Sequence, residues 1–369
     1  MLQKHPFLKI YVLFIIWRAF SFAVAALSPK ILPKFGATFP YWEDRLVGSH
    51  LPHFIWSFGN FDGVHYLGIA KDAYAYQFTQ AFFPLYPVLI KALTIFTKNY
   101  VISGLLISNA FFLIGLFIFY KLVKLNYSES TAIWSVIFLL ATPTSFYFGA
   151  IYTEGIFFLM IVSSFYALQN NKFVLASIIG MFASATRLVG LFLAFALSAS
   201  EKTKKRLLPI IIVPLGLLSY IGYLQIKFHN PLYFLSAQSI FGQERSTNQI
   251  ILLPQVIWRY LKILTTTSGL PLANASLELA STIFAFSVLF IAFRKKFKRE
   301  WLIFSLLALL VPTLSGTFAS MPRYLLIAFP IYIVLAQIQN LKVKIAIITT
   351  FLILQVVCLT LFAQGYWVA

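Results

Sequence analysis

Apolar runs long enough to cross a lipid bilayer recur from one end of this 369-residue chain to the other. A helix needs about 20 mostly apolar residues to span roughly 30 Å of hydrocarbon. Hydrophobic residues make up 60% of the chain and charged residues only 11%, which is too little charge to cover the surface of a soluble globular protein. We therefore predict an all-α polytopic membrane protein, embedded in the bilayer along its whole length.

Short clusters of basic residues between the apolar runs predict the topology. The net charge is +19, but the basic residues do not form one face or one tail, so we predict no nucleic-acid partner. They follow the positive-inside pattern of cytoplasmic loops. Placing the clusters in the cytoplasm predicts about 11 transmembrane helices, with a cytoplasmic N-terminus and an external C-terminus. The expected spans are 8–27, 101–120, 131–150, 155–169, 173–185 with 187–199, 207–226, 270–293, 301–318, 322–339 and 344–363.

Two apolar runs do not fit as simple spans. Counting residues 81–96 as a span would put the next basic cluster on the wrong side, so we predict an interfacial helix that starts at Pro84 and Pro87. The run 173–199 must begin and end in the cytoplasm, which predicts a hairpin of two short helices that turns near Arg187.

Two long external regions result from this topology, 28–100 and 227–269. Both are rich in Trp, Tyr, Pro and His, and long external segments of this kind are where membrane-embedded chemistry would be built. The chain otherwise forms one transmembrane domain, 1–369.

The stretch NFDGVHYLGIAKDAY in the first external region carries the main candidates for chemistry. Asp62 is expected to open a short helix with Asn60 as its cap, and His65 falls on the same face as Asp62. Gly59 and Gly63 flank the acid and allow close approach of a substrate. An acid in a solvated loop is the plain alternative, but a carboxylate beside a cavity in a membrane is a functional candidate by default.

Three further charged positions are candidates for a site. Glu154 lies where the third span reaches the external face, and the alternative role is an acid favoured by the dipole of the next helix. Arg187 at the hairpin turn and Arg323, followed by Tyr324, suit an anionic phosphate group. Both arginines could also be interfacial anchors.

The second external region mixes aromatic residues with Gln238 and Arg245. Aromatic rings and amides suit a sugar, but they equally suit any membrane surface. The chain has no Walker A loop, HExxH, CxxC pair or DxD motif, so we predict neither a metal site nor a cofactor.

The motifs together resemble a known family. FDGVHYLGIAKDAY followed by AFFPLYPVLIKAL is similar to the WDxxHYxxIAxxGY…FFPxxP signature of the GPI mannosyltransferase 2 family and its prokaryotic mannosyltransferase relatives. PTSFYFGAIYTEGIFF, SATRLVG, NPLYFLSAQ and MPRYLLIAFPIY continue the match in order, over residues 56 to 332. Phe61 stands in place of the usual Trp and Ala73 in place of the usual Gly, and both departures concern packing.

The resemblance implies a GT-C fold and an inverting transfer of mannose from a polyprenyl-phosphate donor to a hydroxyl of a lipid-linked or cell-surface acceptor. It implies that Asp62 is the catalytic base, that Glu154 lies in the second external loop and that Arg187 lies in the donor-facing hairpin. From their positions we expect His65, which would orient the acid or the acceptor, and Glu154 to belong to the catalytic site, on the external side of what we expect to be the cell membrane. The residues expected to bind substrate are Tyr66, Tyr152, Arg187, Gln238, Arg245, Arg323 and Tyr324.

Two other functions are compatible with a chain of this kind. A transporter or flippase of a lipid-linked sugar would share the spans and buried charges, although the paired repeats common in transporters are not visible. A membrane scaffold would not need an acid in a glycine-flanked aromatic motif.

Overall fold

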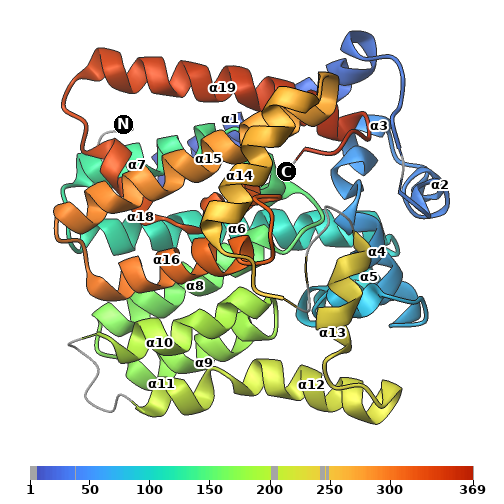
Figure 1. Cartoon of the computed structure of the whole chain (residues 1–369), viewed down its shortest axis with the longest axis horizontal. Coiled ribbons are helices and arrows are strands. Elements are labelled where there is room, and N and C mark those ends of the chain that lie inside the picture. The colour runs from blue at the N-terminus through green and yellow to red at the C-terminus, as the bar shows by residue number, and fades with distance from the viewer. Residues whose placement is uncertain (1–5, 38, 201–206, 242–245, 247–248, 369) are drawn as a thin grey trace. The chain divides into compact units, whose positions relative to one another are not determined.

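The structure is a computed structural model that describes residues 6–37, 39–200, 207–241, 246 and 249–368. Regular structure in these residues is helical throughout, which confirms the all-α prediction (Figure 1). Five helices are long and apolar enough to cross a membrane: α1 (Pro6–Ile31), α6 (Tyr100–Lys124), the pair α11 and α12 (together Leu207–Phe228), α15 (Gly269–Arg294) and α19 (Leu341–Ala363). Five shorter apolar helices accompany them: Leu85–Thr97, Glu129–Ala141, Glu154–Gln169, Phe173–Ser184 and Leu188–Ser198.

The chain divides into two compact units, each of which is discontinuous in sequence. Unit 1 contains Met1–Ala75, Pro84–Lys172 and Tyr332–Val368. Unit 2 contains Tyr76–Phe83 and Phe173–Ile331. Most of the region 28–100, predicted to be external, therefore belongs to unit 1, whereas the helical hairpin and the region 227–269 belong to unit 2. The single-domain organisation stays a prediction.

Unit 1 is built on two helix pairs, α1 with α19 and α6 with α8. Close approach of the second pair depends on Gly155 in α8, because a methyl group added there would lie 2.7 Å from the carbonyl oxygens of Ser108 and Phe148. Helix α8 spans Glu154–Gln169. The other helices of unit 1 are α2 (Trp42–Arg45), α3 (His53–Trp56), α4 (Asp62–Asp72), α5 (Leu85–Thr97), α7 (Glu129–Ala141) and most of α18 (Pro330–Ala336), with 3-10 turns at Val47–Ser49, Ser57–Gly59 and Ser145–Gly149.

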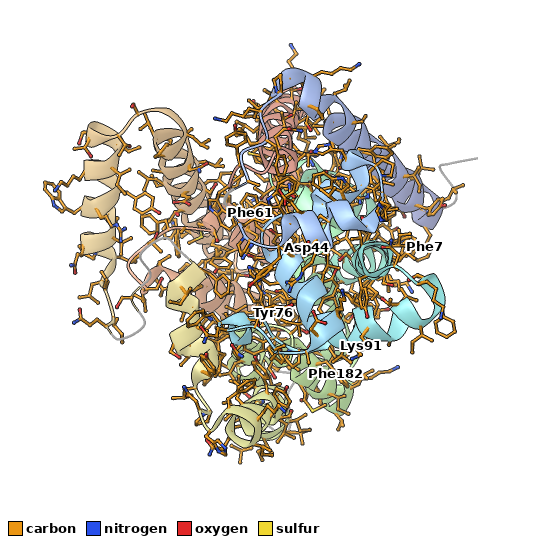
Figure 2. All side chains as sticks on the ribbon, turned by 90° about the vertical axis from the view of Figure 1, so that its right-hand side faces the viewer. Phe7, Asp44, Phe61, Tyr76, Lys91 and Phe182 are labelled. Atoms are coloured by element: carbon orange, nitrogen blue, oxygen red, sulfur yellow. The ribbon has the colours of Figure 1, made fainter. Side chains whose placement is uncertain are left out.

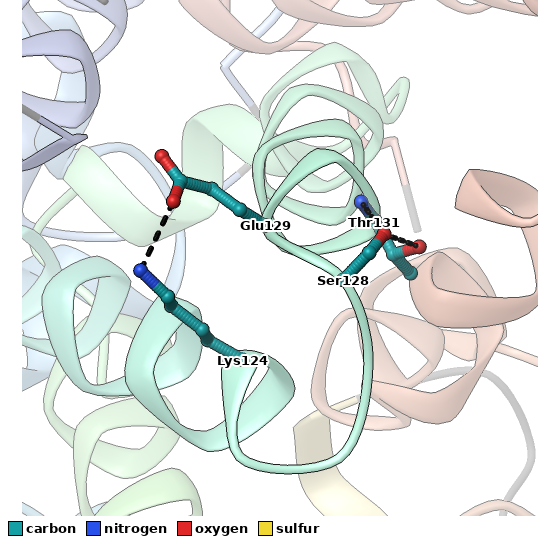
Figure 3. A network of polar contacts seen from close by, with 4 residues as sticks. All are labelled: Lys124, Ser128, Glu129 and Thr131. Atoms are coloured by element: carbon teal, nitrogen blue, oxygen red, sulfur yellow. Dashed lines mark hydrogen bonds and ion pairs between the residues drawn. The ribbon is translucent and has the colours of Figure 1, made fainter. Parts of the chain in front are cut away.

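The turn between α6 and α7 shows how a basic cluster ends a span (Figure 3). Ser128 caps α7, accepting a hydrogen bond from the backbone N–H of Thr131 at 3.2 Å, as N-terminal caps do. Lys124 in the last turn of α6 pairs with Glu129 at 3.0 Å. Both side chains are exposed, so the pair contributes little to stability.

Unit 2 contains the hairpin expected at 173–199. Its first arm, α9, ends at Ser184 and the second arm begins at Leu188, with Arg187 in extended backbone between them. Gly190 makes the turn tight, because a methyl group there would lie 2.4 Å from the backbone of Ala183. The helices of unit 2 are α9 (Phe173–Ser184), α10 (Phe192–Ser198), α11 (Leu207–Ile212), α12 (Leu215–Phe228), α13 (Tyr233–Ser236), α14 (Leu253–Thr266), α15 (Gly269–Arg294), α16 (Arg299–Thr313) and α17 (Met321–Tyr324), with 3-10 turns at Thr79–Ala81, Leu188–Leu191, Ala237–Phe241 and Leu325–Ile327.

Two expected spans are broken by proline. The helix expected at 131–150 ends at Ala141, because a residue before proline avoids the helical region and Thr142 is extended with ψ 138°. A single helix at 322–339 is wrong, since α17 ends at Tyr324 and α18 (Pro330–Ala336) starts afresh at its proline. Proline lacks the N–H that would continue the helix. Residue 331 ends unit 2, so the unit boundary falls within α18.

Candidate functional site

Asp62 is the one residue of the stretch 56–70 that is not buried. It is half-buried at the first position of α4, while its neighbours on both sides pack inside unit 1. Lys71 and Asp72, at the other end of α4, are exposed. An acidic residue that is not buried, among neighbours that are, is placed to meet a substrate.

The turn before Asp62 differs from the expected cap. The side chain of Asn60 does not cap α4, so that prediction is wrong: its Nδ2 donates to the carbonyl oxygens of Phe362 at 2.8 Å and Ala363 at 3.3 Å. The cause lies in Phe61, whose φ of 59° reverses the chain direction just before the helix, an unusual conformation for a bulky residue. Asn60 thereby ties the turn to the end of α19.

An aromatic cluster holds Phe61 in this conformation. Its ring centroid lies 4.5 Å from that of Phe39, 5.1 Å from Trp367 and 5.9 Å from Phe362. Figure 2 labels Phe61 at the start of α4. The Phe in place of the family's usual Trp still fills an aromatic core, which agrees with a packing role for this departure.

Tyr152 links the segment before α8 to the turn that carries Asp62. Its hydroxyl donates to the carbonyl of Asn60 at 2.9 Å and accepts from the backbone N–H of Asp62 at 3.3 Å. The N–H of Ile151 donates to the carbonyl of Phe58 at 2.9 Å. Tyr152 is only 1% exposed, so these bonds form away from competing water and hold the start of α4 in place.

His65 lies one turn along α4 and is 8% exposed. The pKa of His65 is lowered to about 4, mainly by burial; the charge of Asp62 opposes this shift and that of Arg45 contributes to it. The imidazole is therefore neutral near pH 7, with one N–H donor and one acceptor nitrogen. Arg45 itself donates to the carbonyl of Val64 at 2.9 Å. This arrangement suits His65 for orienting a neighbouring group.

Glu154 is buried at the first position of α8. The helix dipole favours an acid there. Close to it in unit 1 is a polar chain in which the hydroxyl of Tyr86 bonds to Ser108 at 2.7 Å, and Ser108 donates to the carbonyl of Tyr152 at 3.2 Å. The ring of Tyr66, also buried, meets Tyr86 edge to face at 5.2 Å. The catalytic role of Glu154 and the substrate contacts of Tyr66 and Tyr152 stay predictions.

Unit 2 brings two of the predicted phosphate-binding elements together. The guanidinium of Arg187 lies over the ring of Tyr324, 5.7 Å from its centroid. Arg323, the residue before Tyr324, is buried in α17. Gln238 is half-buried in the 3-10 turn Ala237–Phe241, and Arg245 lies outside the described residues. The phosphate and sugar contacts of all these residues stay predictions.

No group of three or more His, Cys, Asp or Glu side chains that could hold a metal ion occurs among the residues the structure describes. The prediction that the chain uses no metal is not tested by this finding.

Several residues that shape the site were not found from the sequence. The sequence pattern predicts that Asn60 caps a helix, and it predicts no role in the site for Arg45, Tyr86 or Ser108. Their roles depend on partners brought close by packing, such as the 302 positions that separate Asn60 from Phe362. Only the proximity of Asn60 and Arg45 to the Asp62 motif could have drawn attention to them.

Comparison with known proteins agrees with these motifs. A 204-residue segment is 24% identical to GPI mannosyltransferase 2 of Cryptococcus neoformans var. neoformans serotype D (strain JEC21), covering 52% of this chain and 46% of that protein. A 136-residue segment is 29% identical to GPI mannosyltransferase 2 of Drosophila pseudoobscura pseudoobscura, covering 34% of this chain and 29% of that protein. The matches thus span less than half the length of these curated relatives. No solved structure matches this chain.

The family match covers residues 8–205, more than half of the chain, under the description Mannosyltransferase (PIG-V). That range contains Asp62 and His65 on α4, Glu154 on α8 and Arg187 at the hairpin turn. With its transmembrane helices and this match, the chain is an integral membrane protein that belongs to the Mannosyltransferase (PIG-V) family.

Proposed function

We propose that this protein is a membrane mannosyltransferase that moves mannose from a polyprenyl-phosphate donor to a hydroxyl of a lipid-linked or cell-surface acceptor. The observation that carries the proposal is the position of Asp62 at the start of α4, where it is the one residue of the stretch 56–70 that is not buried. Family membership and the similarity to two GPI mannosyltransferase 2 proteins support the choice of sugar and of reaction.

Asp62 acts as the general base in this proposal. A hydroxyl is a poor nucleophile near neutral pH, and a positioned carboxylate can take its proton as attack proceeds. The acceptor oxygen forms a bond to the anomeric carbon while the bond from that carbon to the phosphate oxygen breaks. The electron pair leaves with the polyprenyl phosphate, and the sugar inverts its anomeric configuration. His65, neutral and one helical turn away, orients the base or the acceptor.

The departing polyprenyl phosphate carries negative charge, so it needs electrostatic stabilisation rather than a general acid. Arg187 and Arg323 supply it in this proposal, because guanidinium groups bind phosphate oxygens in a bidentate manner. The aromatic and amide side chains predicted to bind substrate would hold the sugar, including Tyr66 and Gln238. The reaction written this way needs no metal ion or other cofactor.

The proposed site lies on the external side of the cell membrane. This orientation depends on the positive-inside pattern, which places the basic clusters in the cytoplasm and the region 28–100 outside. A cysteine introduced at Ser49, in a variant whose natural Cys358 is replaced, should react with an impermeant thiol reagent on intact cells. Reaction only after permeabilisation would place the site on the other side.

The substitution Asp62→Asn tests the base directly, because it keeps the size of the side chain but cannot accept a proton. Loss of a general base is worth about 10²- to 10⁴-fold in rate. We expect transfer of radiolabelled mannose from a mannosyl-phosphoryl polyprenol to a membrane glycolipid extract to fall by that factor, with donor affinity unchanged. Asp72→Asn is the matched control, an exposed acid on the same helix, and should transfer at the wild-type rate. Equal activity of Asp62→Asn and wild type would move the base elsewhere, with Glu154 the next candidate.

A further inference from the structure

Arg18 is a buried cation at the middle of the transmembrane helix α1. It is the thirteenth of 26 residues in α1 and only 7% exposed. In the part of the chain that the structure describes, its Nη1 and Nη2 have no hydrogen-bond partner and no carboxylate forms an ion pair with it. Taking an ion out of water is unfavourable even after its surroundings relax. An arginine inside a span therefore calls for a function.

Two aromatic rings face the guanidinium of Arg18. Its central carbon lies 4.0 Å from the centroid of Phe22 and 4.2 Å from that of Phe58. The two rings meet each other edge to face at 5.5 Å. Attraction between a cation and an aromatic face is weak compared with the cost of removing an unpaired charge from water. The arginine thus costs the fold more stability than its contacts return.

Phe58 connects Arg18 to the turn that carries Asp62. Phe58 lies in the 3-10 turn Ser57–Gly59, and its carbonyl accepts the hydrogen bond from Ile151. Arg18 also touches the segment before Ile151, because a methyl group added to Gly149 would lie 2.8 Å from Nη1. One guanidinium therefore packs against both segments that Tyr152 and Ile151 join at the start of α4.

The nitrogens of Arg18 are closed off from solvent. Nη1 and Nη2 each expose less than 1 Å², so a substrate cannot reach them in this structure. Because these two nitrogens cannot contact a substrate, we look for the effect of Arg18 in the backbone segments that it packs against.

We propose that Arg18 is a positioning residue that holds Phe58 against Ile151 and thereby fixes the start of α4. Its effect on transfer rests on the proposed function, in which Asp62 is the base. Its effect on the structure does not. A displacement of about 1 Å at a reacting group can cost about 100-fold in rate, which is reason enough to retain a cation that destabilises the fold.

Arg18→Met separates this role from a purely structural one. Methionine supplies an unbranched apolar side chain and removes the unpaired charge, and replacing buried ionic groups by apolar side chains is often neutral or stabilising. For the purified full-length protein in detergent, we expect an unfolding midpoint equal to or above that of wild type. We expect faster hydrogen exchange at the backbone amides of Gly63, Val64 and Ile151, and a fall in kcat of about 10- to 100-fold with little change in donor KM.

Lys30→Met is the matched control, since it removes an exposed cation from the last turn of the same helix. It should leave both amide exchange and transfer at their wild-type values. Phe58→Leu provides a second route: it removes the ring but not the charge, and should speed exchange at the same amides. This variant keeps the proposal testable if Arg18→Met does not fold.

Unchanged exchange at Gly63 and Ile151 in both variants would overturn the positioning role, whatever the activity. A lower unfolding midpoint for Arg18→Met with unchanged kcat would also overturn it, by showing that Arg18 serves stability alone. Failure of the proposed function is recognised separately: wild type would then transfer no mannose, while the difference in exchange between wild type and Arg18→Met would remain.

Discussion

Removing the hydroxyl of Tyr152 should disturb the site more than it disturbs the fold. The change Tyr152→Phe deletes two hydrogen bonds, one to the carbonyl of Asn60 and one from the N–H of Asp62. The carbonyl of Asn60 keeps a long bond of 3.4 Å from Gly63. Leaving a buried polar group unsatisfied costs about 1–3 kcal/mol. Because the carbonyl of Asn60 keeps one bond and Asp62 is only half-buried, we expect the free energy of unfolding to fall by about 1–2 kcal/mol.

Tyr147→Phe is the control for this change. The ring of Tyr147 packs 4.8 Å from that of Tyr152, and its buried hydroxyl donates to the carbonyl of Val368 rather than to the Asp62 turn. Both variants should lose comparable stability, measured as the unfolding midpoint by the fluorescence of the seven tryptophans. Only Tyr152→Phe should lower kcat for mannose transfer, by about tenfold or more. Equal loss of kcat in the two variants would show that the hydroxyl of Tyr152 does not position Asp62.

Three more predictions concern pH, the phosphate and the hairpin. The folded protein lowers the pKa of His65 from its ordinary 6.5 to about 4, so the unfolded chain takes up the proton first and stability is lost as the pH falls from 6.5 towards 4. This difference in pKa corresponds to about 3 kcal/mol of stability. The acid-induced fall in the unfolding midpoint should therefore be smaller in His65→Gln than in wild type. Arg187→Met should raise the Kd for a mannosyl-phosphoryl polyprenol by about 10-fold or more, and binding as tight as wild type would remove Arg187 from the phosphate site. Gly190→Ala should lower the yield of folded protein in detergent, because the added methyl meets the backbone of Ala183 at 2.4 Å, and normal yield and midpoint would show that the hairpin turn is not tight.

The spans and the helix that starts at Asp62 could be predicted from sequence because their signals are local. Apolar length, basic flanks and proline positions are all contained within short windows. The hairpin at 173–199 could be predicted because the basic clusters require both ends of this run to lie in the cytoplasm. The break at Pro330 is not predicted, because the apolar run 322–339 is long enough to indicate one continuous span even though it contains a proline.

The support around Asp62 could not be predicted, because it depends on contacts between distant segments. The side chain of Asn60 follows an ordinary capping pattern in sequence, yet the unusual backbone of Phe61 turns it to the end of α19. Arg18 is one cation in an apolar run, and nothing nearby in the sequence indicates that Phe58 will lie over it. Such partners are set by helix packing rather than by local propensity.

An assay that follows both donor and product in one sample tests directly whether this protein transfers mannose. Purified protein in liposomes would receive a mannosyl-phosphoryl polyprenol of known anomeric configuration together with a membrane glycolipid extract. Mass spectrometry would detect a glycolipid heavier by one hexose, and NMR would assign its new linkage. We predict a mannosylated product whose anomeric configuration is opposite to that of the donor, absent or strongly reduced with Asp62→Asn. Donor that crosses the bilayer intact, with no mannosylated product from wild type, would contradict the account and identify a transporter of lipid-linked sugar.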